Sequence, residues 1–190
     1  MNAEYTRKFV HIGTGLLTMF FPVLFTHYTW VIVICGLFFI LLSISLQFGF
    51  LPSINSVQRK SYGSLAYPAV VILTFVFYYF KTKNFSQNYF YFYIPILTMA
   101  LADPVAALFG QRFPFGKFSI GKEQKTIVGS IAFFLVALAV NFLLLPTNNV
   151  LFLFLIPLAA TFAEAFTNKG LDNLTIPVSI IFVLYFYPCV

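Results

Sequence analysis

The chain has 190 residues, of which 61% are hydrophobic and 8% are charged, and its mean hydropathy is +0.93. With 27 Phe and 11 Tyr residues among them, the large apolar side chains are more numerous than a core of this length could bury. This composition excludes a soluble globular domain, a disordered chain and a disulfide-stapled domain, and it predicts an integral membrane protein. The net charge of +6 would suit a nucleic-acid-binding protein, but membrane topology explains it better, so no nucleic-acid partner is expected.

Unbroken apolar runs of 16 to 23 residues divide the chain, and in lipid such runs favour helices over a β-barrel. The loops between them are too short to form a further domain, so residues 1–190 are expected to form one unit. The sequence therefore predicts an all-α membrane bundle of about seven spanning helices, over residues 9–26, 29–48, 64–80, 88–110, 127–145, 149–167 and 173–188.

The basic residues are distributed unequally between the two sides that seven helices define. Two of them, Lys81 and Lys83, fall on the side of the C-terminus, and nine fall on the side of the N-terminus. Cytoplasmic loops carry the excess of Lys and Arg, so the N-terminus is predicted to be cytoplasmic and the C-terminus to lie on the opposite side. All five acidic residues lie in or near the cytoplasmic third, which places any active site there: Glu4, Asp103, Glu123, Glu164 and Asp172.

Three polar residues stand at the start of the first predicted helix. Arg7 and His11 are four residues apart, which stacks them on one helix face, and Lys8 lies between them. Two fixed cations and a titratable ring could serve catalysis. The alternative is a positive-inside anchor, with His11 reaching the membrane interface.

The fourth predicted helix contains Asp103 followed directly by Pro104. Because proline disfavours helical geometry at the preceding residue, we expect the helix to break there, with Asp103 as the N-cap of a half-helix ending at Gly110. An aspartate inside a membrane helix is a functional candidate by default. The alternative is a plain proline kink.

The longest loop, residues 111–126, is rich in glycine and lysine. Gly116 to Lys122 fit the spacing of a P-loop, but Glu123 occupies the Ser/Thr position and no buried strand precedes the loop. A Walker fold is therefore rejected. The segment remains a candidate phosphate cradle or, alternatively, an ordinary basic loop; the candidate nucleotide-binding residues are Gly110, Lys117, Lys122, Lys125, Thr126, Gly129 and Ser130.

Three carboxylates, those of Asp103, Glu164 and Asp172, are expected at a similar depth. Mg²⁺ prefers one or two carboxylates together with substrate phosphates, so these residues form a candidate magnesium site, with Asn173 beside it. The alternative is that Asp172 or Asn173 only caps the last helix.

Taken in order, these motifs resemble the CTP-dependent polyprenol kinase family, which includes dolichol, phytol and farnesol kinases and the CTP-dependent diacylglycerol kinase. The segment from Lys60 to Gly63, with Tyr67 and Pro68 after it, also resembles phytol kinases, and the similarity runs from residue 7 to about 177. The motifs that carry it are Arg7-Lys8-x-x-His11, Asp103-x-x-Ala106-x-x-x-Gly110, Lys122-x-x-Lys125-Thr126-x-x-Gly129-Ser130, and Glu164 followed by Leu171-Asp172-Asn173-x-x-Ile176-Pro177.

The resemblance implies an enzyme that transfers a phosphoryl group from CTP to the hydroxyl of a membrane-embedded lipid alcohol, with Mg²⁺. It marks Arg7, Lys8, Asp103 and Gly110 as matches to essential positions and residues 122–130 as the nucleotide loop. One departure is Val128, where many relatives have Glu. Two other functions stay open: a phosphatidate cytidylyltransferase, whose His-Gly-Gly signature is missing here, and a non-enzymatic transporter.

Overall fold

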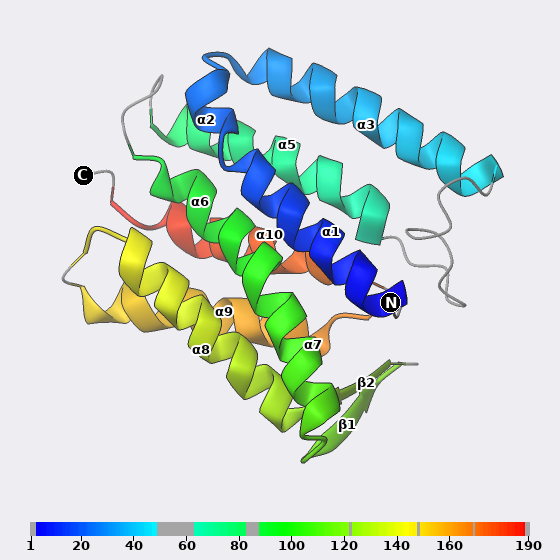
Figure 1. The fold of residues 1–190 in the computed structure, drawn as a ribbon. Coiled ribbons are helices and arrows are strands. Elements are labelled where there is room, and N and C mark those ends of the chain that lie inside the picture. Colours follow the sequence, from blue (N-terminus) through cyan, green and yellow to red (C-terminus); the bar gives the residue numbers. More distant parts are fainter. Residues whose placement is uncertain are drawn as a thin grey trace.

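The computed structural model describes residues 3–48, 63–82, 88–121, 123–147, 149–168 and 170–188, and it confirms an all-α membrane bundle (Figure 1). Each of the seven predicted runs is helical to within a few residues. The elements are α1 (Ala3–Thr18), α2 (Phe21–Leu24), α3 (Tyr28–Phe48), α5 (Gly63–Lys81), α6 (Phe90–Leu97), the π-helical turn η1 (Thr98–Ala102), α7 (Asp103–Arg112), β1 (Lys117–Ile120), β2 (Glu123–Thr126), α8 (Ile127–Leu144), α9 (Val150–Phe166) and α10 (Asp172–Tyr185).

Within the described residues, four helices are long and apolar enough to cross a membrane: α3, α5, α8 and the continuous helix Phe90–Arg112 formed by α6, η1 and α7. The apolar helices Lys8–Leu24, Val150–Phe166 and Asp172–Tyr185 are shorter. In the first of these, Pro22 explains why α1 ends at Thr18. Proline lacks an N–H group and its ring clashes with the carbonyl four residues earlier, so the chain turns and restarts as α2.

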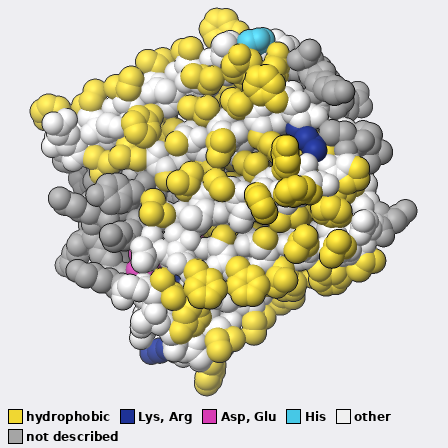
Figure 2. Space-filling view, turned by 180° about the vertical axis from the view of Figure 1, so that it is seen from behind, with side chains coloured by type: hydrophobic (Ala, Val, Ile, Leu, Met, Phe, Trp, Pro, Cys, Tyr) yellow, Lys and Arg dark blue, Asp and Glu magenta, His cyan; other side chains and the backbone are white. Residues whose placement is uncertain are grey.

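The helices pack as neighbouring antiparallel pairs (Figure 1). The closest pairs are α9 with α10, α7 with α8, α3 with α5, and α8 with α9. Large side chains from several helices fill the interior without exposure, among them Phe75, Phe92 and Phe133. The face shown in Figure 2 carries many exposed apolar side chains and few charges, as expected of a surface that contacts lipid.

One buried hydrogen bond compensates for a proline inside α9. Pro157 has no N–H group, which leaves the carbonyl of Leu153, four residues earlier, without its helical donor. The side chain of Asn141, buried in α8, donates from Nδ2 to that carbonyl at 3.0 Å and to the carbonyl of Phe152 at 3.2 Å. In lipid no water can replace such a donor, so Asn141 stabilises the contact between α8 and α9.

Replacing Asn141 with Leu should therefore lower the free energy of unfolding by about 1 kcal/mol, the usual value of one buried bond between membrane helices. The measurement is unfolding in mixed detergent micelles. In a Pro157→Ala background, the new N–H of Ala can bond to the Leu153 carbonyl, so the same Asn141→Leu change should cost less. An equal cost in both backgrounds would contradict this role for Asn141.

Aromatic side chains gather where α3 and α6 begin and where α5 and α10 end. Tyr28 and Tyr79 contact each other with ring centroids 4.9 Å apart. Lys81 Nζ donates to the carbonyl of Tyr185 at 2.8 Å and also faces the Tyr91 ring. Rings with a polar end are enriched at the membrane interface, so this group indicates where one membrane surface meets the bundle.

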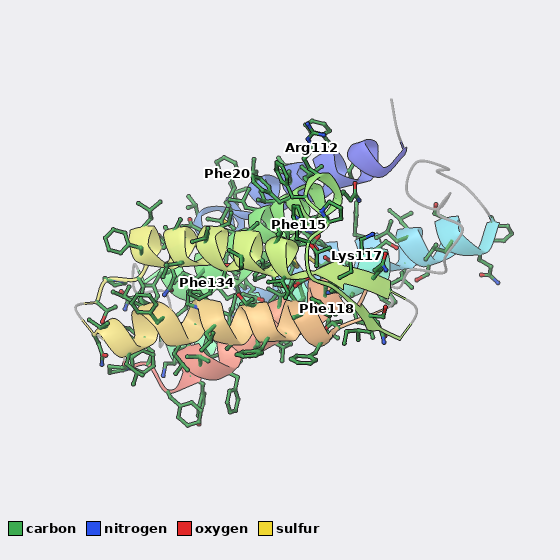
Figure 3. All side chains as sticks on the ribbon, turned by 90° about the horizontal axis from the view of Figure 1, so that it is seen from below. Phe20, Arg112, Phe115, Lys117, Phe118 and Phe134 are labelled. Carbon is green, nitrogen blue, oxygen red and sulfur yellow. The ribbon has the colours of Figure 1, made fainter. Side chains whose placement is uncertain are left out.

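The opposite end of the bundle carries a feature that the sequence did not predict. Residues 111–126, expected as a loop, contain an antiparallel hairpin in which Lys117 pairs with Thr126 and Ile120 with Glu123. Gly121 at its turn has a φ of +61°, a conformation that glycine adopts without strain. In Figure 3 the hairpin carries Lys117 and Phe118, whereas Phe134 lies further along α8.

Candidate active site

A break was predicted in the fourth helix at Asp103. The helix instead continues through this residue, and its hydrogen-bonding pattern changes just before it. Residues Thr98–Ala102 form a π-helical turn, and Asp103 itself has helical dihedral angles, φ −62° and ψ −50°. The predicted N-cap at Asp103 is therefore wrong: its position is taken by Ala102, and no side chain caps α7. The π turn accommodates the Pro104 ring, which would clash with the carbonyl of Ala100 in a regular α-helix.

Helix α1 packs on this π turn and brings His11 to it. His11 Nε2 lies 3.3 Å from the carbonyl oxygen of Met99, within the π turn. The His11 ring also meets the Tyr67 ring edge to face, with centroids 5.6 Å apart. Lys8 is only 8% exposed, so it is not a solvated surface anchor, whereas the side chain of Arg7 lies outside the described part of the chain.

The first residue of α10, Asp172, lies beside residues from three other elements. Its carboxylate interacts electrostatically with Asp103, Lys125 and His11. The alternative in which Asp172 or Asn173 only caps the helix is wrong, because Leu171 occupies the cap position and no side chain caps α10. Asp172 Oδ1 instead accepts a bond from the N–H of Asn173 at 2.9 Å, and Asn173 Nδ2 donates to the carbonyl of Gly63 at 3.0 Å.

Lys125 of the hairpin is bound to Glu164 in the last turn of α9. The Lys125 ammonium donates to Glu164 Oε1 at 2.7 Å and to the Glu164 carbonyl oxygen. Both side chains are nearly buried, at 12% and 10% exposure. The second carboxylate oxygen, Glu164 Oε2, is buried and has no hydrogen-bond partner among the described residues.

The predicted set of three metal-binding carboxylates is not assembled in one place. Among the described residues, no three His, Cys, Asp or Glu side chains lie close enough to hold one ion. Glu164 is engaged with Lys125, whereas Asp103 and Asp172 lie within electrostatic range of each other. A pair of carboxylates still fits Mg²⁺, which takes one or two of them together with phosphate oxygens. Two like charges near each other also repel, and a divalent cation would relieve that repulsion.

The predicted nucleotide-binding glycines, Gly110 and Gly129, lie where α7 and α8 pack closely against each other. A Cβ on Gly110 would lie 2.7 Å from Thr126 Oγ1, and a Cβ on Gly129 would lie 2.9 Å from the carbonyl oxygen of Ala106. Thr126 caps α8 by accepting from the Gly129 N–H, and the Ile127 N–H donates to Gly116. Two N–H donors of this helix terminus are therefore already used, which leaves fewer backbone groups there for a phosphate.

The remaining predicted nucleotide-binding residues lie in different settings. Lys117 is exposed on β1 (Figure 3), and Ser130, in the first turn of α8, has a buried hydroxyl with no partner among the described residues. Lys122 is outside the described residues, as is the segment from Lys60 to Tyr62.

Two buried hydroxyls near the site were not predicted to take part in it. Tyr67 Oη is buried near the hydroxyls of Thr14 and Thr18 but has no well-formed hydrogen bond among the described residues. Thr98 Oγ1, in the π turn, is likewise buried and unpaired in the described part of the chain. The signal for Tyr67 was present, since it precedes Pro68 in the phytol-kinase-like segment, but no spacing rule links it to His11.

The chain was compared with known proteins. No protein-family model matches the sequence, and no solved structure matches the chain. A phytol kinase from Synechocystis sp. is 32% identical over 183 residues, which cover 92% of this chain and 76% of the relative. On this similarity, the chain belongs to the phytol kinase family, within the polyprenol kinases that its motifs resemble.

Proposed function

We propose that this protein phosphorylates a membrane-embedded isoprenoid alcohol with CTP as the phosphoryl donor. The observation that carries the proposal is the similarity to a phytol kinase along most of the chain. The cluster of His11, Asp103, Lys125 and Asp172 at one end of an apolar bundle supports it, because such a site can meet a lipid chain and a nucleotide together.

The reaction joins the alcohol oxygen to the γ-phosphorus of CTP and breaks the bond between that phosphorus and the β–γ bridging oxygen. The products are the lipid monophosphate and CDP, and the hydroxyl proton passes to a base. Asp103 is our candidate for that base, because it is the carboxylate placed furthest inside a membrane helix and it lies beside the π turn.

Asp103 and Asp172 would hold Mg²⁺, which supplies charge neutralisation of the phosphates when bound. Lys8, Lys117 and Lys125 would neutralise the rest of the triphosphate charge, and Arg7 and Lys122 are candidates for the same task. His11, held by the Met99 carbonyl, would orient the acceptor hydroxyl. The nine-to-two distribution of basic residues supports a cytoplasmic site, with the C-terminus on the opposite side.

The test is a product assay on the purified protein in lipid nanodiscs with phytol, farnesol and a long polyprenol. We expect CTP with Mg²⁺ to give CDP and lipid phosphate only when an alcohol is present, and ATP to serve poorly. Equal or better use of ATP would remove the CTP part of the proposal.

The same assay separates the alternative functions. A cytidylyltransferase would release pyrophosphate and would need phosphatidate rather than an alcohol. A transporter would produce neither CDP nor pyrophosphate with any of these acceptors. Either result would replace the kinase proposal.

A further inference from the structure

We propose that Glu164 is a positioning residue: it holds the Lys125 ammonium in place so that this group can bind a phosphate oxygen of the nucleotide. This proposal rests on the proposed function. Glu164 was expected to bind a metal ion. The contacts assign it another role, because its carboxylate and its backbone carbonyl both accept from Lys125.

The position of Glu164 in the helix explains why its carboxylate needs the Lys125 ammonium as a partner. Glu164 lies in the last turn of α9, where the helix dipole is negative and a second negative charge is unfavourable. A lysine at this position is favourable, since it can bond to the terminal carbonyl groups. The pair is nearly buried, so removing the cation would leave a carboxylate with neither water nor a partner.

The bonds to Glu164 limit the number of Lys125 N–H donors that could bind a ligand. An ammonium group has three N–H donors, and Glu164 accepts two of them. The third N–H is not used by Glu164, and Asp172 lies within electrostatic range of the same ammonium group. Since Lys125 immediately precedes the N-cap of α8, its backbone is also fixed by the hairpin and the helix. One donor held in one direction would bind a phosphate oxygen with little loss of side-chain entropy.

The kinetic test is a double-mutant cycle of Glu164→Gln and Lys125→Met in the full-length protein in nanodiscs. We expect each single variant to raise the KM for the nucleotide roughly tenfold, the value of one charged hydrogen bond, with kcat little changed. If Glu164 acts through Lys125, the double variant should be no worse than Lys125→Met alone. Additive losses, or rescue of Glu164→Gln by excess Mg²⁺, would identify a metal ligand and overturn the proposal. An unchanged KM with a lower unfolding temperature would identify a merely structural pair and would also overturn it.

A second measurement needs no nucleotide. An amine-reactive ester, followed by mass spectrometry, compares Lys125 with Lys117, which is exposed on the neighbouring strand and serves as the internal control. We expect Lys125 to react several-fold more slowly than Lys117, and Glu164→Gln to accelerate Lys125 alone. Equal rates in the unmodified protein would overturn the proposal even if the kinase reaction is confirmed. If no nucleotide supports turnover but Lys125 is protected by Glu164, the proposed reaction fails while the positioning of Lys125 stands.

Discussion

Replacing Asp103 with Asn should reduce turnover by a factor of about 10² to 10⁴, the range typical of a lost general base. Asn keeps nearly the same shape and removes the negative charge. Because Asp103 and Asp172 repel each other, the variant should be at least as stable as the unmodified protein. The measurement is the rate of lipid phosphate formation at saturating CTP and alcohol, together with the unfolding temperature.

The Mg²⁺ dependence indicates which task Asp103 performs. If Asp103 holds the ion, the Asn variant should need more Mg²⁺, and Asp172→Asn should behave in the same way. If Asp103 accepts the proton, turnover should fall with little change in the Mg²⁺ requirement. Near-normal turnover with an unchanged Mg²⁺ requirement would remove Asp103 from the site and leave Asp172 as the remaining member of the pair.

The positions of the helices could be predicted from the sequence because lipid imposes a minimum length on every apolar run. The bounds of α5 and α8 differ from the predicted ranges by a single residue at each end or less. The form of the helix at Asp103 could not be predicted in the same way. Pro104 removes one donor and adds a steric clash, and both a break and a π turn resolve that clash. Packing of α1 against the π turn is a tertiary effect that local sequence does not contain.

The hairpin was missed because each of its strands has only four residues and the second strand has no apolar residue. Lys117–Ile120 alternates polar and apolar residues, and its exposure alternates in the same way, but two apolar residues are too few to separate a strand from a loop, and Glu123–Thr126 is wholly polar. The pairing of Lys125 with Glu164 was missed for another reason. The two residues are 39 positions apart, and a single sequence gives no means of pairing charges across that distance. Each was assigned separately, one to the nucleotide and one to the metal.

Gly110 and Gly129 illustrate how the same glycine residues can have two different physical explanations. Both were selected as part of a nucleotide-binding segment. In the structure each lies where a Cβ would overlap α7, α8 or the Thr126 cap, so close helix packing alone accounts for glycine there. The distinction matters for mutagenesis, since a loss of activity at either position would report helix packing as readily as nucleotide contact.

Replacing Gly15 with Ala should disturb the contact that holds α1 on the π turn. The new Cβ would lie 2.3 Å from the Cβ of Ala100, and neither methyl group can rotate away. Helix α1 must therefore shift, which should lower the free energy of unfolding by about 1 to 3 kcal/mol, the usual range for overpacking. Because His11 lies one turn earlier on α1, the shift should also withdraw His11 from the Met99 carbonyl and reduce turnover.

The matched control is Gly13→Ala, two residues earlier in the same helix. Apart from its chain neighbours and its own helix backbone, no heavy atom of the described residues lies within 4 Å of a Cβ at Gly13, so the added methyl group meets open space. A helical Gly→Ala change without a clash usually stabilises a protein, by about 0.5 to 1 kcal/mol. The two variants should thus shift the unfolding temperature in opposite directions, and only Gly15→Ala should lose turnover. If both retain full activity, the contact between α1 and the π turn is not needed to place His11, and α1 contributes to the site through Lys8 or Arg7 alone.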